Sequence, residues 1–450
     1  MDIRNETGKL YATIKDMPVM DFCSFLDVNA ILENRRFRDA ASVFLDDDRN
    51  AWRFLRACGV AEKSVTDRSD TNEERFKKFA DLLPLAAGSP LYSGVYLVLR
   101  RFFDIREVLD GDTASSIWDL VQVRLDEGLT VRDVLSEYGV KRIAVATDPA
   151  ASVEPFHKAL KAGLDMDVVP AFNANQAMWI DGRDWDLYMQ EFAAQTGSEI
   201  ETMEDVKDAL LYRMRVFATL GCKTITVYLE NAAYRKMPME KLDDVVGRVS
   251  HTKGRPTAEE TEGYNTELIR FLARKAKEYD WVLQLRFGKC RNVSTRGFAS
   301  VGSRKGYTAL GHAVDGGKLA QLLDSLDCDD ILPRIVLSSA NPYDNAVLAS
   351  LTGAFPGSGV AGTLQVGLTH VANQLARQLD VLADYLPIGI SIGPAIRART
   401  PFDFSAVSEW RYALCRWLVR LADDGRYPLE AEPELAARIV YGNLKTVINE

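Results

Sequence analysis

Histidine is scarce in this chain, which has 4 histidines among 450 residues. The 6 cysteines are spread along the sequence without CxxC or zinc-finger spacing, so a disulfide scaffold or a structural zinc site is disfavoured and a reducing compartment fits. No apolar run approaches the length that spans a bilayer, and the N-terminal residues lack the apolar core of a signal peptide. We therefore expect a cytoplasmic protein that does not enter a membrane.

An excess of positive charge is also lacking. The net charge is -9 at pH 7, whereas proteins that bind nucleic acid or anionic membranes hold phosphate with clustered lysine and arginine. The glycine-rich stretches follow no phosphate-loop spacing, so the sequence predicts no nucleotide and no other cofactor. With 47% hydrophobic residues the chain can bury a large core. The expectation is a globular protein with a small-molecule partner and no nucleic-acid partner.

Eight short apolar runs rich in β-branched residues recur along the chain, and helical periodicity fills the intervals. Such near-continuous hydrophobicity is typical of parallel strands that helices cover on both faces. Eight units predict an α/β fold, a (β/α)₈ TIM-type barrel. The expected strands are 18–25, 142–148, 166–173, 223–230, 281–288, 334–339, 362–368 and 388–393.

The interval between the first two runs is far longer than a βα loop and is helical in pattern throughout. We therefore expect three parts. Residues 1–26 form the N-terminal segment with the first strand, residues 27–140 form a helical insertion domain, and residues 141–450 form the remainder of the barrel.

Two later segments, 203–221 and 266–279, are amphipathic and predict crossover helices. Residues 244–264 are polar and contain glycine and proline, which predicts a mobile loop.

Chemistry in such barrels lies at the carboxyl ends of the strands, so the residues that close each run are the candidates. They include Asp148 and Asn173 as substrate-binding candidates and one histidine, His370. Imidazole titrates near neutral pH, so His370 is the first candidate for a general base. A hydrogen-bonded loop histidine is the alternative.

Three cations, Arg286, Lys289 and Arg291, share one predicted strand end. Such a cluster suits a carboxylate or phosphate, and a salt bridge to Asp148 or Glu230 is the alternative. The preceding strand presents Tyr228 and Glu230 on the same side, because they alternate with apolar residues.

Several segments resemble the uronate (glucuronate) isomerases of the amidohydrolase superfamily, and together they span almost the whole chain. The segments are KDMPVMDF, AWRFLRACGV, GSPLY, QLRFGKCRN and NPYDNAVLASLTGAFPGSGVAGTLQVG. The resemblance implies a distorted barrel with a helical insertion after the first strand, and interconversion of hexuronates and ketouronates by proton transfer between C1 and C2. It also implies that Trp52 and Arg53 contact the substrate, although Arg53 as a solvated helix residue is the alternative.

The resembling segments differ from the family at its metal ligands. The family's Asp-Tyr-His-Cys-His corresponds to Asp21-Phe22-Cys23-Ser24-Phe25, its Gln-Leu-His-Ile-Gly to residues 284–288, and its Thr-Asp-Ser-Arg to residues 392–395. A divalent metal needs three or four converging N, O or S donors, so we expect no metal site. Arg286 instead places a permanent cation where the family has a histidine.

We therefore hypothesise a metal-independent enzyme that acts on a small carboxylated, polyhydroxylated substrate by proton transfer, giving isomerisation or elimination. His370 or Cys23 would be the base, Tyr228 the acid and Arg286 the cation that stabilises an anion. Cys23 is alternatively a small buried hydrophobe. The two other hypotheses are a genuine glucuronate or galacturonate isomerase, and a non-catalytic protein that binds a sugar acid or a protein. We also expect a homo-oligomer.

Overall fold

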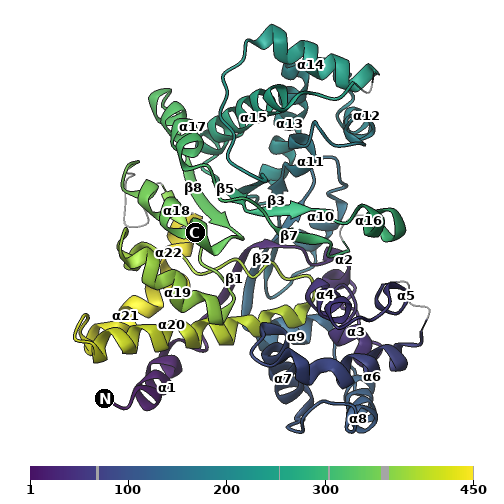
Figure 1. The fold of residues 1–450 in the computed structure, drawn as a ribbon, viewed down its shortest axis with the longest axis vertical. Helices are drawn as coiled ribbons and strands as arrows, with labels where there is room; N and C mark the ends of the chain where they lie inside the picture. Colours follow the sequence, from purple (N-terminus) through teal and green to yellow (C-terminus); the bar gives the residue numbers. More distant parts are fainter. Residues whose placement is uncertain (67–69, 253, 303–304, 356–363, 449–450) are drawn as a thin grey trace.

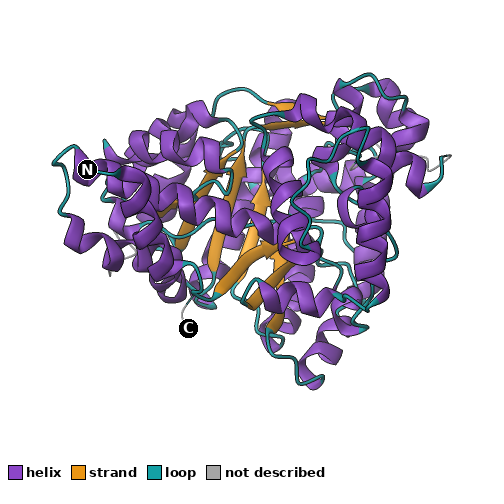
Figure 2. Ribbon diagram, turned by 90° about the horizontal axis from the view of Figure 1, so that it is seen from below, coloured by secondary structure: helices purple, strands orange, loops and turns teal. Residues whose placement is uncertain are grey.

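Seven parallel strands form one sheet at the centre of the molecule, in the order β1-β2-β3-β4-β5-β8-β9. The computed structural model describes residues 1–66, 70–252, 254–302, 305–355 and 364–448. Helices surround the curled sheet (Figure 1; Figure 2). The strands are β1 (Val19–Ser24), β2 (Val140–Thr147), β3 (Asp167–Asn173), β4 (Thr224–Tyr228), β5 (Val282–Phe287), β8 (Arg334–Ser339) and β9 (Leu364–Val366).

Each of these strands overlaps a run that the sequence predicts, which confirms the α/β class and the parallel arrangement. Every residue of β1 and of β4 is buried, because helices cover the sheet and apolar side chains avoid water on both faces. Residues 362 and 363 of the seventh predicted run lie outside the described residues.

The predicted eighth strand at 388–393 is wrong. Ile388–Ile390 form a 3-10 turn, η3, and a proline on each side of the run lacks the N–H donor that a strand ladder requires. A later residue instead lies beside β1, where the carbonyl of Ala398 accepts a hydrogen bond of 2.8 Å from the amide of Phe25. The seven-stranded sheet is therefore established for the described residues, and a closed eight-stranded barrel stays a prediction.

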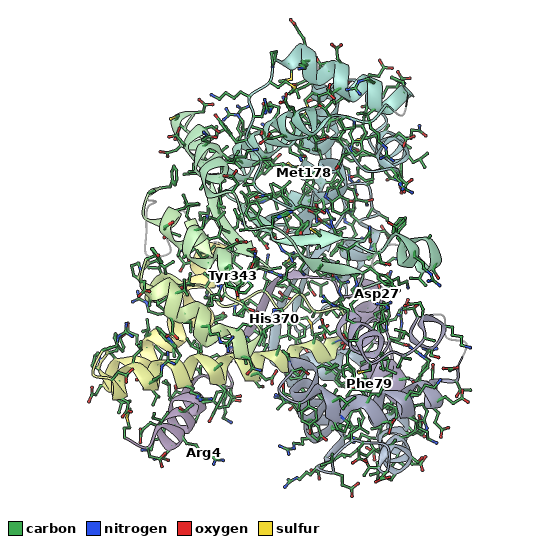
Figure 3. All side chains as sticks on the ribbon, in the orientation of Figure 1. Arg4, Asp27, Phe79, Met178, Tyr343 and His370 are labelled. Atoms are coloured by element: carbon green, nitrogen blue, oxygen red, sulfur yellow. The ribbon has the colours of Figure 1, made fainter. Side chains whose placement is uncertain are left out.

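The segment between β1 and β2 is helical, as predicted. Its elements are α2 (Val28–Leu32), α3 (Ala40–Phe44), α4 (Arg49–Ala57), α5 (Glu62–Val65), α6 (Asn72–Leu82), η1 (Leu83–Ala86), α7 (Pro90–Phe103), α8 (Ala114–Asp126) and α9 (Val131–Glu137). Phe76 and Phe79 of α6 are fully buried, and Figure 3 labels Phe79 among these helices. The division into residues 1–26, 27–140 and 141–450 stays a prediction.

Helices also connect the later strands. They are α10 (Glu154–Lys161) before β3, then α11 (Asn175–Met178), α12 (Trp185–Thr196) and α13 (Met203–Thr219) before β4, α14 (Met239–Thr252) and α15 (Ala258–Glu278) before β5, α16 (Thr295–Val301) and α17 (Gly316–Cys328) before β8, and η2 (Pro342–Asp344) and α18 (Asn345–Thr352) before β9. The predicted crossover helices at 203–221 and 266–279 are confirmed by α13 and α15.

The predicted loop at 244–264 is wrong, because α14 extends to Thr252 and α15 begins at Ala258. Thr257 caps α15 by accepting from the amide of Glu260, whose side chain accepts from the amide of Thr257 in return. This reciprocal capping box satisfies two amides that a helix start otherwise leaves unpaired.

A short antiparallel hairpin of β6 (Lys289–Arg291) and β7 (Thr308–Leu310) follows β5. Gly288 joins β5 to β6 at a φ of +83°, a backbone conformation that favours glycine. Its carbonyl also accepts a hydrogen bond of 3.0 Å from the amide of Gly311. The hairpin therefore places Lys289 and Arg291 just beyond the carboxyl end of the sheet.

The N-terminal helix α1 (Ile3–Ile14) packs against α20 (Ser405–Asp423), a helix from the last part of the chain (Figure 1). No helix among the described residues is both long and apolar enough to span a membrane. The remaining elements are α19 (Ala372–Ala383), η4 (Pro401–Phe404), α20 (Ser405–Asp423), η5 (Leu429–Ala431), α21 (Glu432–Ala437), the π-helical turn η6 (Arg438–Gly442) and α22 (Asn443–Val447).

Candidate functional site

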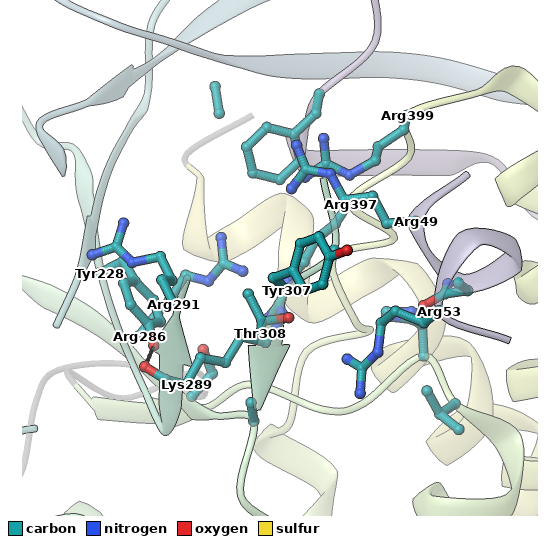
Figure 4. A pocket seen from close by; sticks show the side chains of 18 of the residues that line it. Arg49, Arg53, Tyr228, Arg286, Lys289, Arg291, Tyr307, Thr308, Arg397 and Arg399 are labelled. Atoms are coloured by element: carbon teal, nitrogen blue, oxygen red, sulfur yellow. Dashed lines mark hydrogen bonds between the residues drawn. The ribbon is translucent and has the colours of Figure 1, made fainter. Parts of the chain in front are cut away.

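A cavity of about 2330 Å³ opens at the carboxyl ends of the strands. Side chains from the strand ends, from α4 and from the segment after η3 line it together (Figure 4). Eight of the ten residues predicted for the site line this cavity: Arg53, Asp148, Asn173, Tyr228, Arg286, Lys289, Arg291 and His370. The sequence therefore predicts the place of the cavity well.

Cys23 and Trp52 are not among the lining residues. Cys23 is fully buried, and the guanidinium Nη1 of Arg286 lies 3.5 Å from its Sγ. The indole of Trp52 donates a hydrogen bond of 2.8 Å to the carbonyl of Leu45, and its ring lies 5.2 Å from the ammonium of Lys305. Cys23 and Trp52 therefore lie behind the lining residues and pack against the cavity wall rather than facing the cavity.

Three cations lie close together at the centre of the site: Arg286 of β5, Lys289 of β6 and Arg397 from the segment after η3. None of them forms a salt bridge with a carboxylate in the described part of the chain. The alternative of a salt bridge from Arg286 or Lys289 to Asp148 or Glu230 is therefore wrong for those two cations. Arg291 ends the same hairpin strand.

Burial and mutual repulsion act on the pKa values of these cations. Burial lowers the pKa of Lys289 to about 7, and the charges of Arg397 and Arg286 act in the same direction. Burial and the charge of Arg286 lower the pKa of Arg397 to about 9. Positive charge therefore accumulates at this point at a cost in free energy, since each charged group disfavours the others.

His370 lines the cavity beside the same three cations. Burial lowers the pKa of its imidazole to about 4, and the charges of Arg397 and Lys289 contribute. The side chain is consequently neutral at neutral pH, and its conjugate acid is far more acidic than that of an ordinary histidine. This weakens His370 as the general base that the sequence suggests.

Tyr228 is buried at the end of β4, and its hydroxyl donates a hydrogen bond to the carbonyl of Lys289. The guanidinium carbon of Arg291 lies 3.4 Å from the ring centre of Trp179 and 4.7 Å from that of Tyr228. Burial raises the pKa of Tyr228 to about 12. Tyr228 is therefore protonated at neutral pH and holds the hairpin that carries Lys289 and Arg291.

Asp148 accepts hydrogen bonds of 3.0 Å from the hydroxyl of Tyr188 and from the amide group of Gln176. Asn173 accepts from the backbone amide of Asn175. The side chain of Asn175 in turn accepts a hydrogen bond of 2.6 Å from the amide of Tyr228. These polar groups fix the strand ends around the cavity.

The sequence pattern does not predict Arg397 and Arg399, although both line the cavity. They follow the expected eighth strand at the point where the chain returns to β1, and Arg397 has a φ of +61°. The run Arg-Ala-Arg at 397–399 is the signal that was available in the sequence. Whether these arginines reach the cavity depends on the path of the segment after η3, which is not a strand.

Two half-buried carboxyl groups of the cavity wall, Asp48 and Asp403, are also missed by the sequence pattern. Burial and the charge of Asp403 raise the pKa of Asp48 to about 7. Burial raises the pKa of Asp403 too, while the guanidinium of Arg399 opposes that shift. Two like charges in one environment disfavour ionisation of both, so the pair retains a proton near neutral pH.

A divalent metal does not fit the residues that the structure describes. Among the described residues, no three side chains of the His, Cys, Asp or Glu type converge in a way that could hold a metal ion. The buried Asp21, within β1, accepts from the amides of Cys23 and Ile396 with one oxygen, and its other oxygen has no hydrogen-bond partner among the described residues. The charged group that acts on the Asp21 carboxyl is the guanidinium of Arg397, which cannot serve as a second metal ligand.

The glucuronate isomerase family model matches residues 2–447. The uronate isomerase of Caldanaerobacter subterraneus subsp. tengcongensis is 32% identical over 439 residues, which cover 96% of this chain and 94% of that protein. The uronate isomerase of Caldicellulosiruptor saccharolyticus is 29% identical over 455 residues, which cover 98% of this chain and 97% of that protein.

Two solved structures share the fold. The uronate isomerase of Thermotoga maritima superposes with a TM-score of 0.93 at 23% identity, over 99% of this chain and 97% of that one. The glucuronate isomerase of Caulobacter crescentus gives a TM-score of 0.92 at 20% identity, over 99% and 94% of the two chains. The resemblance of the sequence segments is thereby confirmed, and an enzyme is favoured over a non-catalytic binding protein. This chain belongs to the uronate isomerase family and is an isomerase.

Proposed function

We propose that this chain interconverts an aldose and a ketose form of a uronate by moving a proton between C1 and C2. Membership of the family supports the reaction class. The observation that carries the proposal is the group of Arg286, Lys289 and Arg397, three neighbouring cations that line the cavity and form no salt bridge among the described residues. A small carboxylated, polyhydroxylated anion supplies the missing negative charge.

Electrostatics favours an anionic ligand here. A buried cation without a partner costs free energy, and an anion that enters the cavity removes much of that cost. Arginine also binds carboxylates through two parallel hydrogen bonds. We assign substrate binding to the cavity-lining residues Arg53, Asp148, Asn173 and Arg291, with Trp52 supporting the helix that carries Arg53.

The same cations suit the reaction intermediate. Removal of the C2 proton leaves an enediolate, whose charge lies on an oxygen that a fixed cation stabilises. Arg286 is placed for this role, because its side chain lies at the end of β5 beside Cys23, Lys289 and Arg397. No step of this scheme requires a metal, and the side chains in the described ranges offer no donor set for one.

The other three predicted catalytic residues bind or position groups of the site and do not carry the proton. Tyr228 stays protonated and fixes the hairpin, His370 offers a neutral imidazole to a substrate hydroxyl, and Cys23 holds Arg286 from behind. A closed barrel with a helical insertion domain, a homo-oligomeric state and a cytoplasmic location remain predictions that accompany the function.

An assay with glucuronate and with galacturonate tests the proposal, run on protein dialysed against a chelator and again with added Zn²⁺ or Mn²⁺. We expect conversion of an aldose to a ketose uronate that neither the chelator nor the metals change by more than about twofold, against a metal-dependent uronate isomerase as the control. Turnover that appears only with metal would refute the role of the cations. No turnover of any uronate would refute the function itself.

A further inference from the structure

Lys289 is held at the cavity by its backbone rather than by its side chain. It pairs with Leu310 in the β6–β7 hairpin, and its carbonyl accepts the hydrogen bond from the hydroxyl of Tyr228. Gly288 turns the chain immediately before it. In Figure 4 the Lys289 side chain lies among the arginines that line the cavity. The backbone of Lys289 is therefore fixed at the cavity, and no hydrogen bond or salt bridge holds its side-chain nitrogen in the described part of the chain.

The groups that face Lys289 are cationic or neutral. Among the described residues they are Arg286 from β5, Tyr228 from β4, Arg53 from α4, His370 from the segment after β9, and Arg397 and Arg399 from the segment after η3. Four guanidinium groups and burial all disfavour a further positive charge. The pKa of Lys289 is accordingly lowered to about 7, so a large fraction of this lysine is a neutral amine at neutral pH.

We propose that the neutral amine of Lys289 is the base that carries the proton between C2 and C1 of the sugar acid, an inference that rests on the proposed function. A neutral lysine in a cationic environment is a competent proton acceptor. The pKa of Lys289 lies closer to neutral pH than that of His370, the imidazole that the sequence suggests as the base.

The proton and electron count closes without a further reactant. The amine of Lys289 removes the proton from C2, the C–H electrons form a C1–C2 double bond, and the C1 carbonyl electrons move onto O1 beside Arg286. The hydroxyl proton on O2 moves to O1. The ammonium of Lys289 then returns its proton to C1, and the O2 electrons form the C2 carbonyl of the ketose.

A covalent route through Lys289 does not give the same product. Condensation of the amine with the C1 aldehyde would release water and form an imine. The proton shift would then leave C1 joined to the lysine through a secondary amine, which water does not hydrolyse. Lys289 is therefore a base in this scheme and not a nucleophile, and borohydride should trap no adduct.

Two substitutions separate a base from an anion-binding cation. Lys289→Arg keeps a positive charge but cannot accept a proton at neutral pH, and Lys289→Met removes both properties. We expect both variants to lose about 10³-fold in kcat, within the range for a general base, with KM changed by less than about threefold because Arg53 and Arg291, to which substrate binding is assigned, are unchanged. Lys158→Met, at an exposed position on α10, is the control.

Two further readouts report the proton transfer directly. The kcat of the unsubstituted chain should fall as the pH falls below about 7, because protonation removes the base. Loss of deuterium from C2-deuterated uronate to water should stop in both Lys289 variants. Melting temperatures and uronate binding by calorimetry establish that the variants fold and bind.

Nearly full kcat in Lys289→Arg, or continued C2 exchange in Lys289→Met, would overturn the assignment while the proposed function stands. An unsubstituted chain that converts no uronate would instead overturn the proposed function. The two failures are therefore distinguishable within one experiment.

Discussion

Arg286 is the residue at which the sequence and the structure agree most closely. The sequence predicts a cation at this strand end, and the structure places the guanidinium of Arg286 among other cations at the cavity. A long charged side chain at the end of a buried strand points into the cavity, because the apolar core around the strand would leave its charge without water. Its position could therefore be predicted without knowledge of the rest of the fold.

The substitution Arg286→Met tests whether this cation stabilises the enediolate. We expect kcat/KM for a uronate to fall by about 10²–10³-fold, the usual effect of removing one group that stabilises an oxyanion. The melting temperature should not fall, because the substitution removes repulsion with Lys289 and Arg397. Steady-state kinetics and thermal unfolding measure both, with the exposed Arg106→Met as the control. Unchanged kcat/KM would remove Arg286 from the mechanism.

Asp48 gives a prediction about stability and pH. Its pKa in the folded chain is raised from 3.8 to about 7, so the folded state binds a proton that the unfolded state has lost. Stability from this group is therefore present below about pH 4 and is lost as the pH rises to about 7.

The substitution Asp48→Asn keeps an oxygen that accepts from the amides of Asn50 and Ala51 at the start of α4, and it removes the charge. We expect the variant to melt several degrees above the unsubstituted chain at pH 8 and at nearly the same temperature at pH 4.5. Thermal unfolding at the two pH values is the measurement. An equal difference at both pH values would contradict the raised pKa.

At the scale of the elements, the helices and buried strands could be predicted because hydrophobic periodicity is local. The short hairpin of β6 and β7 could not, since three residues carry no period. The start of α15 was predictable in principle, because Thr257 and Glu260 have the capping-box spacing. The segment after η3 could not be placed, because its prolines end any strand pattern and only packing against β1 decides its path.

Gly288 connects β5 to the hairpin, and Gly288→Ala tests how much the site depends on that connection. The added Cβ would clash with the Oγ of Ser339 and would lie 2.9 Å from the amide nitrogen of Asn341, and the φ of +83° disfavours any side chain. We expect a loss of stability of more than about 2 kcal/mol together with a loss of activity, because strain and a backbone clash add.

Gly59 provides the matched control, since its φ is +85° and nothing lies within 4 Å of a Cβ built there. Gly59→Ala should cost about 1–2 kcal/mol for the left-handed backbone alone and leave kcat unchanged. Denaturant unfolding and steady-state kinetics give both quantities. Equal losses in the two variants would show that the contact with Asn341 is unimportant.

At the scale of the whole molecule, the α/β class and the family could be read from the sequence, because many short segments agree along its length. The arrangement of the site could not be read in the same way. Residues as distant in sequence as Arg53, Lys289 and Arg397 meet at one cavity, and no local pattern encodes that meeting.

The gathering of Arg286, Lys289 and Arg397 also bears on how well the empty chain resists unfolding. Folding brings these like charges together, so an anion that binds only the folded state should stabilise it by mass action. Inorganic phosphate should raise the melting temperature in a saturable way, beyond the effect of sodium chloride at equal ionic strength, and Lys289→Met should blunt the rise. An equal effect of the two salts would contradict this. The ligand of this cavity is therefore expected to stabilise the folded chain as well as to react.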